Sequence, residues 1–186
     1  MATTPMAQLG LPTPCTEYDV RTLMGHLIGT AERGLGTAER RSMRDVPHVV
    51  TYVPDEGLAR AYAGLAKRIA HAWAGLSGDD EVRAAWGECS ALDAAQGYTV
   101  ETVTHGWDLA VATGQDSEAP DDIASRCLLV AESIVPRRLR GVMYAEPASP
   151  GSAASATDRL ASLLGRQRPP RISAASVLVN PSRGST

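Results

Sequence analysis

The sequence predicts an all-α domain that folds as a bundle of four substantial helices. In four separate segments apolar residues recur three or four positions apart, which is the periodicity of an amphipathic helix. Two of these segments follow a Ser/Thr-x-x-Asp pattern of the kind that caps a helix start. The chain contains no phenylalanine and is rich in alanine and glycine, a composition that suits closely packed helices.

The first helix is expected to start after Pro12 and Pro14, where Thr16-Glu17-Tyr18-Asp19 has the form of a capping box with Thr16 as the cap. It should run to about Arg33 or beyond. Its inward face is marked by apolar residues at helical spacing: Val20, Leu23, Leu27 and Ile28. His26 lies beside two of them, on or near that face.

Residues 40–54 mix charges and prolines with a short Val-Val-Thr-Tyr-Val run, so we expect a connection that is compatible with extended backbone. A second amphipathic helix should follow Asp55. Its apolar positions are Leu58, Tyr62, Leu65, Ile69, Trp73 and Leu76. The polar stretch Ser77-Gly78-Asp79-Asp80 is expected to close it.

The third helix should run from the capping box Ser90-Ala91-Leu92-Asp93 to Thr113, with Gly114 as its C-cap and Gly97 and Gly106 as weak points. Pro120-Asp121-Asp122 predicts the start of a fourth. One side of that helix would carry Ile123, Cys127, Val130 and Ile134.

A single helical domain is expected over residues 1–165, including a short helical piece from Thr157 to Leu164. Residues 166–186 have the composition of a flexible tail. The only apolar cluster in that tail is Val177-Leu178-Val179, for which a strand or a partner contact stays open.

Charge and composition exclude several classes of protein. The net charge is −3 and the charges are mixed along the chain, so no basic stripe is available for nucleic acid. Residues 1–10 lack a positively charged leader, and no window approaches the roughly 20 apolar residues of a membrane span. We therefore expect a cytoplasmic protein without membrane or nucleic-acid partners. Its three cysteines are too widely spaced for a metal knuckle and are interpreted as reduced thiols.

Glu101 and His105 form the most informative pair of polar residues. They are four positions apart in a helical segment, so both side chains lie on one face and could hold one ion. A salt-bridged pair on the helix surface is the alternative. Together with His26 they form a His-Glu-His set, and three protein ligands with a fourth position open are typical of catalytic zinc sites.

Two motifs resemble a known family. Pro12-Thr13-Pro14-Cys15-Thr16-Glu17-Tyr18-Asp19-Val20-Arg21 with Leu23-Met24-Gly25-His26-Leu27 is similar to the first motif of actinobacterial proteins related to the mycothiol-dependent maleylpyruvate isomerase metal-binding domain. The second motif is matched by Glu101 to Asp108 and by the residues that follow, to Gly114. The similarity extends from about Pro12 to Arg166 and places the chain in the wider DinB-like superfamily.

The resemblance implies a DinB-like four-helix bundle in which His26, Glu101 and His105 hold a divalent metal, expected to be Zn²⁺. Family members carry one more helix before the first motif, whereas eleven residues precede Pro12 here. The bundle is therefore expected to lack that helix or to complete it by association, for example as a homodimer.

The activity that the resemblance implies is that of a metal-dependent thiol transferase or isomerase, with mycothiol as a cosubstrate and a second small molecule as substrate. A metal-dependent hydrolase and a non-catalytic binding or accessory protein are the alternatives.

Three more residues are candidates for the site. Asp108, seven positions after Glu101, could orient a ligand or act as a base, or could lie on the surface or cap the helix. Trp107 could line the substrate pocket or belong to the core, and Arg21 could bind an anionic substrate group or remain solvated. His48 and His71 are assigned no role.

Overall fold

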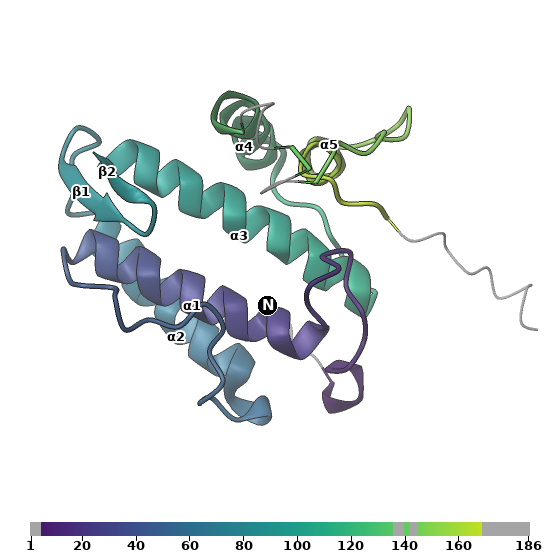
Figure 1. Cartoon of the computed structure of the whole chain (residues 1–186), viewed down its shortest axis with the longest axis horizontal. Coiled ribbons are helices and arrows are strands. Elements are labelled where there is room, and N and C mark those ends of the chain that lie inside the picture. The colour runs from purple at the N-terminus through teal and green to yellow at the C-terminus, as the bar shows by residue number, and fades with distance from the viewer. Residues whose placement is uncertain (1–4, 136–139, 142–144, 169–186) are drawn as a thin grey trace, which may run out of the picture.

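Five α-helices and one small antiparallel hairpin form the part of the chain that the structure describes (Figure 1). The structure is a computed structural model, and it describes residues 5–135, 140–141 and 145–168. In chain order the elements are α1 (Val20–Ala38), α2 (Leu58–Trp73), β1 (Glu81–Ala84), β2 (Gly87–Ser90), α3 (Ala91–Thr113), α4 (Asp121–Ile134) and α5 (Ala156–Leu163), with 3-10 turns at Met6–Gln8 and Asp55–Gly57. None of the helices among these residues has the length and apolar content that crossing a membrane requires.

Helix α1 is largely buried between its neighbours. It packs against α2 on one side and against α3 on another, and α3 in turn contacts α4 and α5, which pair with each other (Figure 1). Of the 19 residues of α1, 15 are buried, so this helix has almost no solvent-facing side. Any polar group that α1 carries on these faces must therefore find its partner inside the protein.

The two largest hydrophobic clusters among the described residues hold most of the helices together. The first surrounds α1 and consists of Leu9, Val20, Leu23, Met24, Leu27, Ile28, Val50, Leu58 and Leu109. The second joins α3 to α4 and α5 through Val100, Cys127, Ala131, Val135, Leu160 and Leu164. Since α3 contributes to both clusters, it connects the α1–α2 half of the molecule to the C-terminal half.

The prediction of a purely α-helical fold is wrong in one respect, because a two-stranded sheet lies between α2 and α3. Strands β1 and β2 pair in antiparallel register, with Val82 opposite Cys89. Along β1, Val82 and Ala84 are buried and alternate with exposed residues, which is the period-two pattern of a strand. The strands are four residues each, too short for that pattern to stand out in the sequence.

The helix boundaries match the sequence-based expectations closely, with one correction. For α3, Ser90 is the N-cap and accepts a hydrogen bond from the Asp93 amide, and Gly114 is the C-cap with a φ of 70°. For α1, the N-cap is Asp19 and not Thr16, because the Tyr18 amide bonds to the Cys15 carbonyl in a preceding turn. No helix or strand occurs within residues 40–54, as expected.

The expected tail is described only at its beginning. Residues 169–186, which include Val177–Val179, lie outside the described part of the chain. Arg166 and Arg168 are described, and both contact the helical domain through ion pairs with Asp108 and Asp158.

Two glycines of α1 let the connection 47–50 lie directly on the helix. A Cβ atom added at Gly25 would come within 2.5 Å of the Val50 carbonyl oxygen, and one at Gly29 within 2.8 Å of the Pro47 carbonyl oxygen. The Val50 amide also donates to the Gly25 carbonyl at 3.0 Å. This close approach places the backbone of His48 beside α1.

The substitution Gly25→Ala is expected to destabilise the protein by about 1–3 kcal/mol, because the new methyl group must push the Val50 backbone away. Gly64→Ala is the matched control: this glycine also lies in a helix, but a Cβ there meets no atom within 4 Å. It should stabilise the protein by roughly 0.5–1 kcal/mol through helix propensity alone. Urea denaturation of the three proteins measures both shifts, and stabilisation by both substitutions would refute the close contact.

Candidate metal centre

Three candidate ligands from two helices converge between α1 and α3. The Nε2 atom of His26, on α1, is 3.0 Å from Oε1 of Glu101, and Nε2 of His105 is 3.4 Å from the same oxygen. All three ligand atoms lie within 4.8 Å of one another. The structure therefore brings together the His-Glu-His set that was expected from the sequence.

The spacing of these atoms fits a tetrahedral ion. Two nitrogen or oxygen ligands, each about 2.0–2.1 Å from zinc, are separated by roughly 3.3 Å along a tetrahedral edge. The two histidines are buried, whereas the side chain of Glu101 is 45% exposed. A group of three ligands that is open to solvent on one side leaves room for a fourth ligand, as in catalytic zinc sites.

Each histidine is anchored by its other ring nitrogen. Nδ1 of His26 lies 3.2 Å from the carbonyl oxygen of His48, and a carbonyl can only accept, so Nδ1 carries the proton. Nδ1 of His105 lies 3.0 Å from Oδ2 of Asp108. In both rings Nε2 is thereby directed at Glu101, and hydrogen bonds of this kind fix the orientation of metal-ligating histidines.

The charges of Glu101 and His105 depend on each other. Burial alone would lower the pKa of His105, but its hydrogen bonds with Asp108 and Glu101 outweigh that effect and raise the pKa of His105 to about 9. Burial would raise the pKa of Glu101, but interactions with His105 and His26 hold it far below its usual range. The metal-free site is thus an ion pair, and an incoming cation would have to displace the proton of His105.

An aromatic and polar wall lies beside His26. The ring of Tyr18 stacks on the His26 ring at a centroid distance of 5.2 Å, and the Tyr18 hydroxyl is 2.8 Å from Nε2 of His48. Burial and the charge of His26 lower the pKa of His48. Sequence reasoning assigned His48 no role, because nothing in its local sequence indicates that the 47–50 connection reaches α1.

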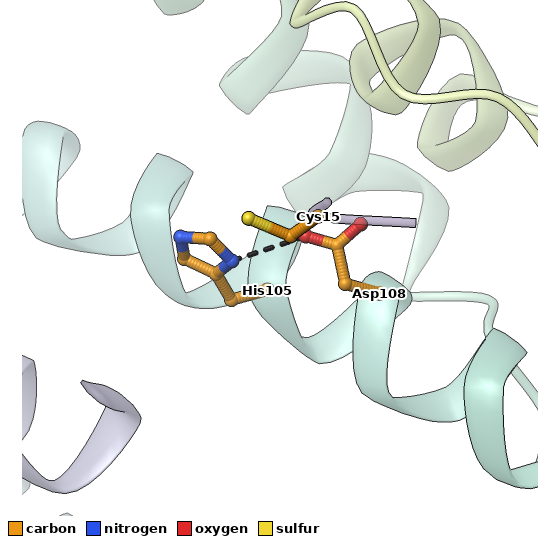
Figure 2. Close-up of side chains that lie close together, drawn as sticks. All are labelled: Cys15, His105 and Asp108. Atoms are coloured by element: carbon orange, nitrogen blue, oxygen red, sulfur yellow. Dashed lines mark hydrogen bonds and ion pairs between the residues drawn. The ribbon is translucent and has the colours of Figure 1, made fainter. Parts of the chain in front are cut away.

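A second group of potential ligands shares His105 with the first. Figure 2 shows Cys15, His105 and Asp108, whose ligand atoms also lie within 4.8 Å of one another. Here, however, Nε of Arg166 lies 3.1 Å from Oδ2 of Asp108 and supplies the positive charge. A guanidinium at that distance would repel a second cation, so the His26–Glu101–His105 group is the better candidate for a metal site.

Cys15 was not recognised as a neighbour of the site from the sequence, although it lies in the first motif. Its thiol is buried, and burial raises its pKa, so Cys15 is a protonated thiol at neutral pH. Cys15, Cys89 and Cys127 are all free, in agreement with their interpretation as reduced thiols.

The three other candidates have clear positions. Asp108 is fully buried against His105, in a position to orient that ring. Trp107 is buried and its indole nitrogen donates to Asp158 at 2.8 Å. Arg21 bonds to Asp55 and to the carbonyl oxygens of Val50 and Val53, so its guanidinium fixes the connection before α2.

Comparison with known proteins places these residues in a family context. The family model of the mycothiol maleylpyruvate isomerase N-terminal domain matches residues 1–110, which include all three candidate ligands. Two uncharacterized proteins of Mycobacterium tuberculosis, Rv0738 and MT0763, are each 32% identical over 165 residues, covering 86% of this chain and 85% of the relative. No solved structure matches the chain.

The metal-free protein is expected to lose stability as the pH rises from about 6.5 to about 9. The pKa of His105 is raised on folding from 6.5 to about 9, so its contribution is complete below the unfolded value and is lost as the folded group deprotonates. The effect is on the order of a few kcal/mol. Urea denaturation across this range measures it, and a His105→Gln variant should show a flatter profile; the same slope in both proteins would exclude His105 as the cause.

Proposed function

Because the chain belongs to the mycothiol maleylpyruvate isomerase N-terminal domain family, we propose that it is a divalent-metal-dependent enzyme that activates a low-molecular-weight thiol for transfer or isomerisation. Mycothiol is the thiol that the family suggests, and zinc is the expected ion. The observation that carries the proposal is the convergence of His26, Glu101 and His105 at distances that suit one tetrahedral ion.

The chemistry of a bound ion follows from its open fourth position. A divalent ion held by these three residues would supply a Lewis acid that lowers the pKa of a thiol and makes the thiolate available at neutral pH. Thiolate is the nucleophilic form of sulfur, so the site would serve reactions in which a thiol adds to an electrophile or is exchanged on one.

The residues around the ligands support this chemistry in three ways. The His48 carbonyl and the Asp108 carboxylate hold the two imidazole rings in the orientation that ligation requires. The side chain of Glu101 is 45% exposed, which leaves the ligand group accessible from solvent on that side. The Tyr18–His48 pair lies beside His26, where it can take up the proton that a thiol loses.

The first test is the metal content of the purified protein. The wild type should contain about one equivalent of zinc or another divalent ion per chain, and a His26→Ala/His105→Ala variant should contain none, since it loses two of three ligands. His71→Ala is the matched control, because His71 lies on the exposed side of α2. Elemental analysis decides the matter: a metal-free wild type that also fails to bind after reconstitution would refute the metal proposal.

The second test is thiol transfer. The metal-loaded wild type should accelerate conjugation of mycothiol to a small electrophile such as chlorodinitrobenzene, and His105→Ala should reduce the rate by at least about a hundredfold because metal and thiol activation are lost together. Circular dichroism checks that the variant is folded.

Other outcomes of the same assay point to the alternatives. Ester hydrolysis that does not depend on thiol would indicate a hydrolase, in which the ion activates water. Mycothiol binding without turnover, and unaffected by metal removal, would indicate a non-catalytic binding protein.

A further inference from the structure

The C-terminal segment of the described chain binds two consecutive residues of α3 that lie next to the metal ligand His105. Asp158, on α5, accepts a hydrogen bond from the indole nitrogen of Trp107 at 2.8 Å. Arg166, just after α5, donates from Nε to Oδ2 of Asp108 at 3.1 Å. Arg166 and Asp108, which are 58 positions apart in the sequence, are thus in direct contact next to the candidate metal site.

We propose that Arg166 is a positioning residue for the metal centre, which acts through Asp108 to hold the His105 ring in the orientation for ligation. This inference rests on the proposed function, because it assigns a role around the same His26–Glu101–His105 site. It assigns a role at the site to a residue beyond residues 1–110, which the family model matches.

The orientation of the Asp108 carboxylate depends on Arg166. The side chain is completely buried, and an ionised carboxylate in such a place is costly unless it is paired. Oδ2 accepts from both His105 and Arg166, whereas Oδ1 has no hydrogen-bond partner within the described residues. The rotation of the carboxylate is therefore determined by the contacts of Oδ2 alone.

The position of Arg166 is itself set by the end of α5. The Arg166 amide donates to the Ala161 carbonyl at 2.9 Å, across a Gly165 whose φ is 81°, which is the arrangement of a Schellman motif. A Cβ atom at Gly165 would collide with Ala145. The guanidinium is further held by the Leu164 carbonyl, which accepts from Nη1 at 3.2 Å. The backbone that carries the Arg166 side chain is thus held in one conformation.

Loss of the guanidinium should weaken metal binding. Without Arg166, Oδ2 of Asp108 keeps only its contact with His105, and nothing else among the described residues holds the carboxylate in one rotation. A carboxylate that is free to rotate no longer holds the His105 ring in the orientation for ligation. Changes in groups that orient metal ligands typically weaken metal affinity 10- to 100-fold.

The test is a titration of the metal-free full chain with Co²⁺, whose visible absorption reports both affinity and coordination geometry. Arg166→Gln should raise the dissociation constant by about 10- to 100-fold and change the Co²⁺ spectrum. Arg168→Gln is the matched control: Arg168 lies in the same segment, but it pairs with Asp158 and covers the Trp107 ring, and it should stay within about twofold of the wild type. Unchanged affinity and spectrum in Arg166→Gln would overturn the proposal.

A double variant separates positioning from general destabilisation. Asp108→Asn/Arg166→Gln removes both charges, so no buried charge is left unpaired. If Arg166 acts through Asp108, this variant should bind Co²⁺ as weakly as Asp108→Asn alone. A further loss of affinity, multiplying the two single effects, would show that Arg166 acts by another route and would contradict the inference.

Imidazole resonances of the metal-free protein distinguish failure of this inference from failure of the proposed function. The hydrogen-bonded Nδ1 proton of His105, assigned by its absence in His105→Gln, should shift or vanish in Arg166→Gln but not in Arg168→Gln. If the wild type binds no metal while this change is seen, the metal proposal fails and the positioning role stands. If the wild type binds metal but Arg166→Gln alters neither the resonance nor the affinity, only the positioning role fails.

Discussion

The buried carboxylate of Asp108 joins the separate parts of this protein at one point. It lies on α3, accepts from His105 on one side and from Arg166 on the other, and has no exposure to solvent. A charge in such surroundings is tolerated only because both contacts are charge-assisted. The packing of the C-terminal segment against α3 and the orientation of a candidate metal ligand therefore depend on the same ion pair.

The two groups of potential metal ligands that share His105 differ in the charged residues beside them. Such a difference in charge can decide where a cation binds. The Cys15–His105–Asp108 group contains good ligand atoms, but Arg166 already neutralises its carboxylate. Among the described residues no guanidinium forms an ion pair with Glu101; its charged partner is His105, whose pKa is raised to about 9, despite burial, by hydrogen bonds with Asp108 and Glu101. A proton can be displaced by a metal, whereas an arginine side chain stays charged. The geometry of ligand atoms alone does not make this distinction.

The orientation of His26 depends on how closely the 47–50 connection approaches α1. Gly25 and Gly29 leave no side chain between α1 and the 47–50 connection, and the His48 carbonyl can then accept from His26. The same approach brings the His48 ring to the Tyr18 hydroxyl. Gly25 and Gly29 thus allow the backbone of the connection to lie against α1. The His48 carbonyl oxygen is then available to His26 as a hydrogen-bond acceptor that does not become protonated.

The sequence by itself determined the helices of this protein, and together with the resemblance of its motifs it indicated the candidate set of metal ligands. Capping residues such as Ser90 and Gly114 and the apolar periodicity of each segment act over a few residues, and the four-residue spacing of Glu101 and His105 puts both on one face of a helix. The β1–β2 hairpin was not predicted, because strands of four residues are too short to show a clear period-two pattern in the sequence. Only the tertiary structure decided that Cys15, His48 and Arg166 surround the ligands, and that Asp108 is buried and paired. Those contacts join residues as far apart in the sequence as Cys15 and Asp108, and they arise from the packing of whole helices and connections, which no local pattern encodes.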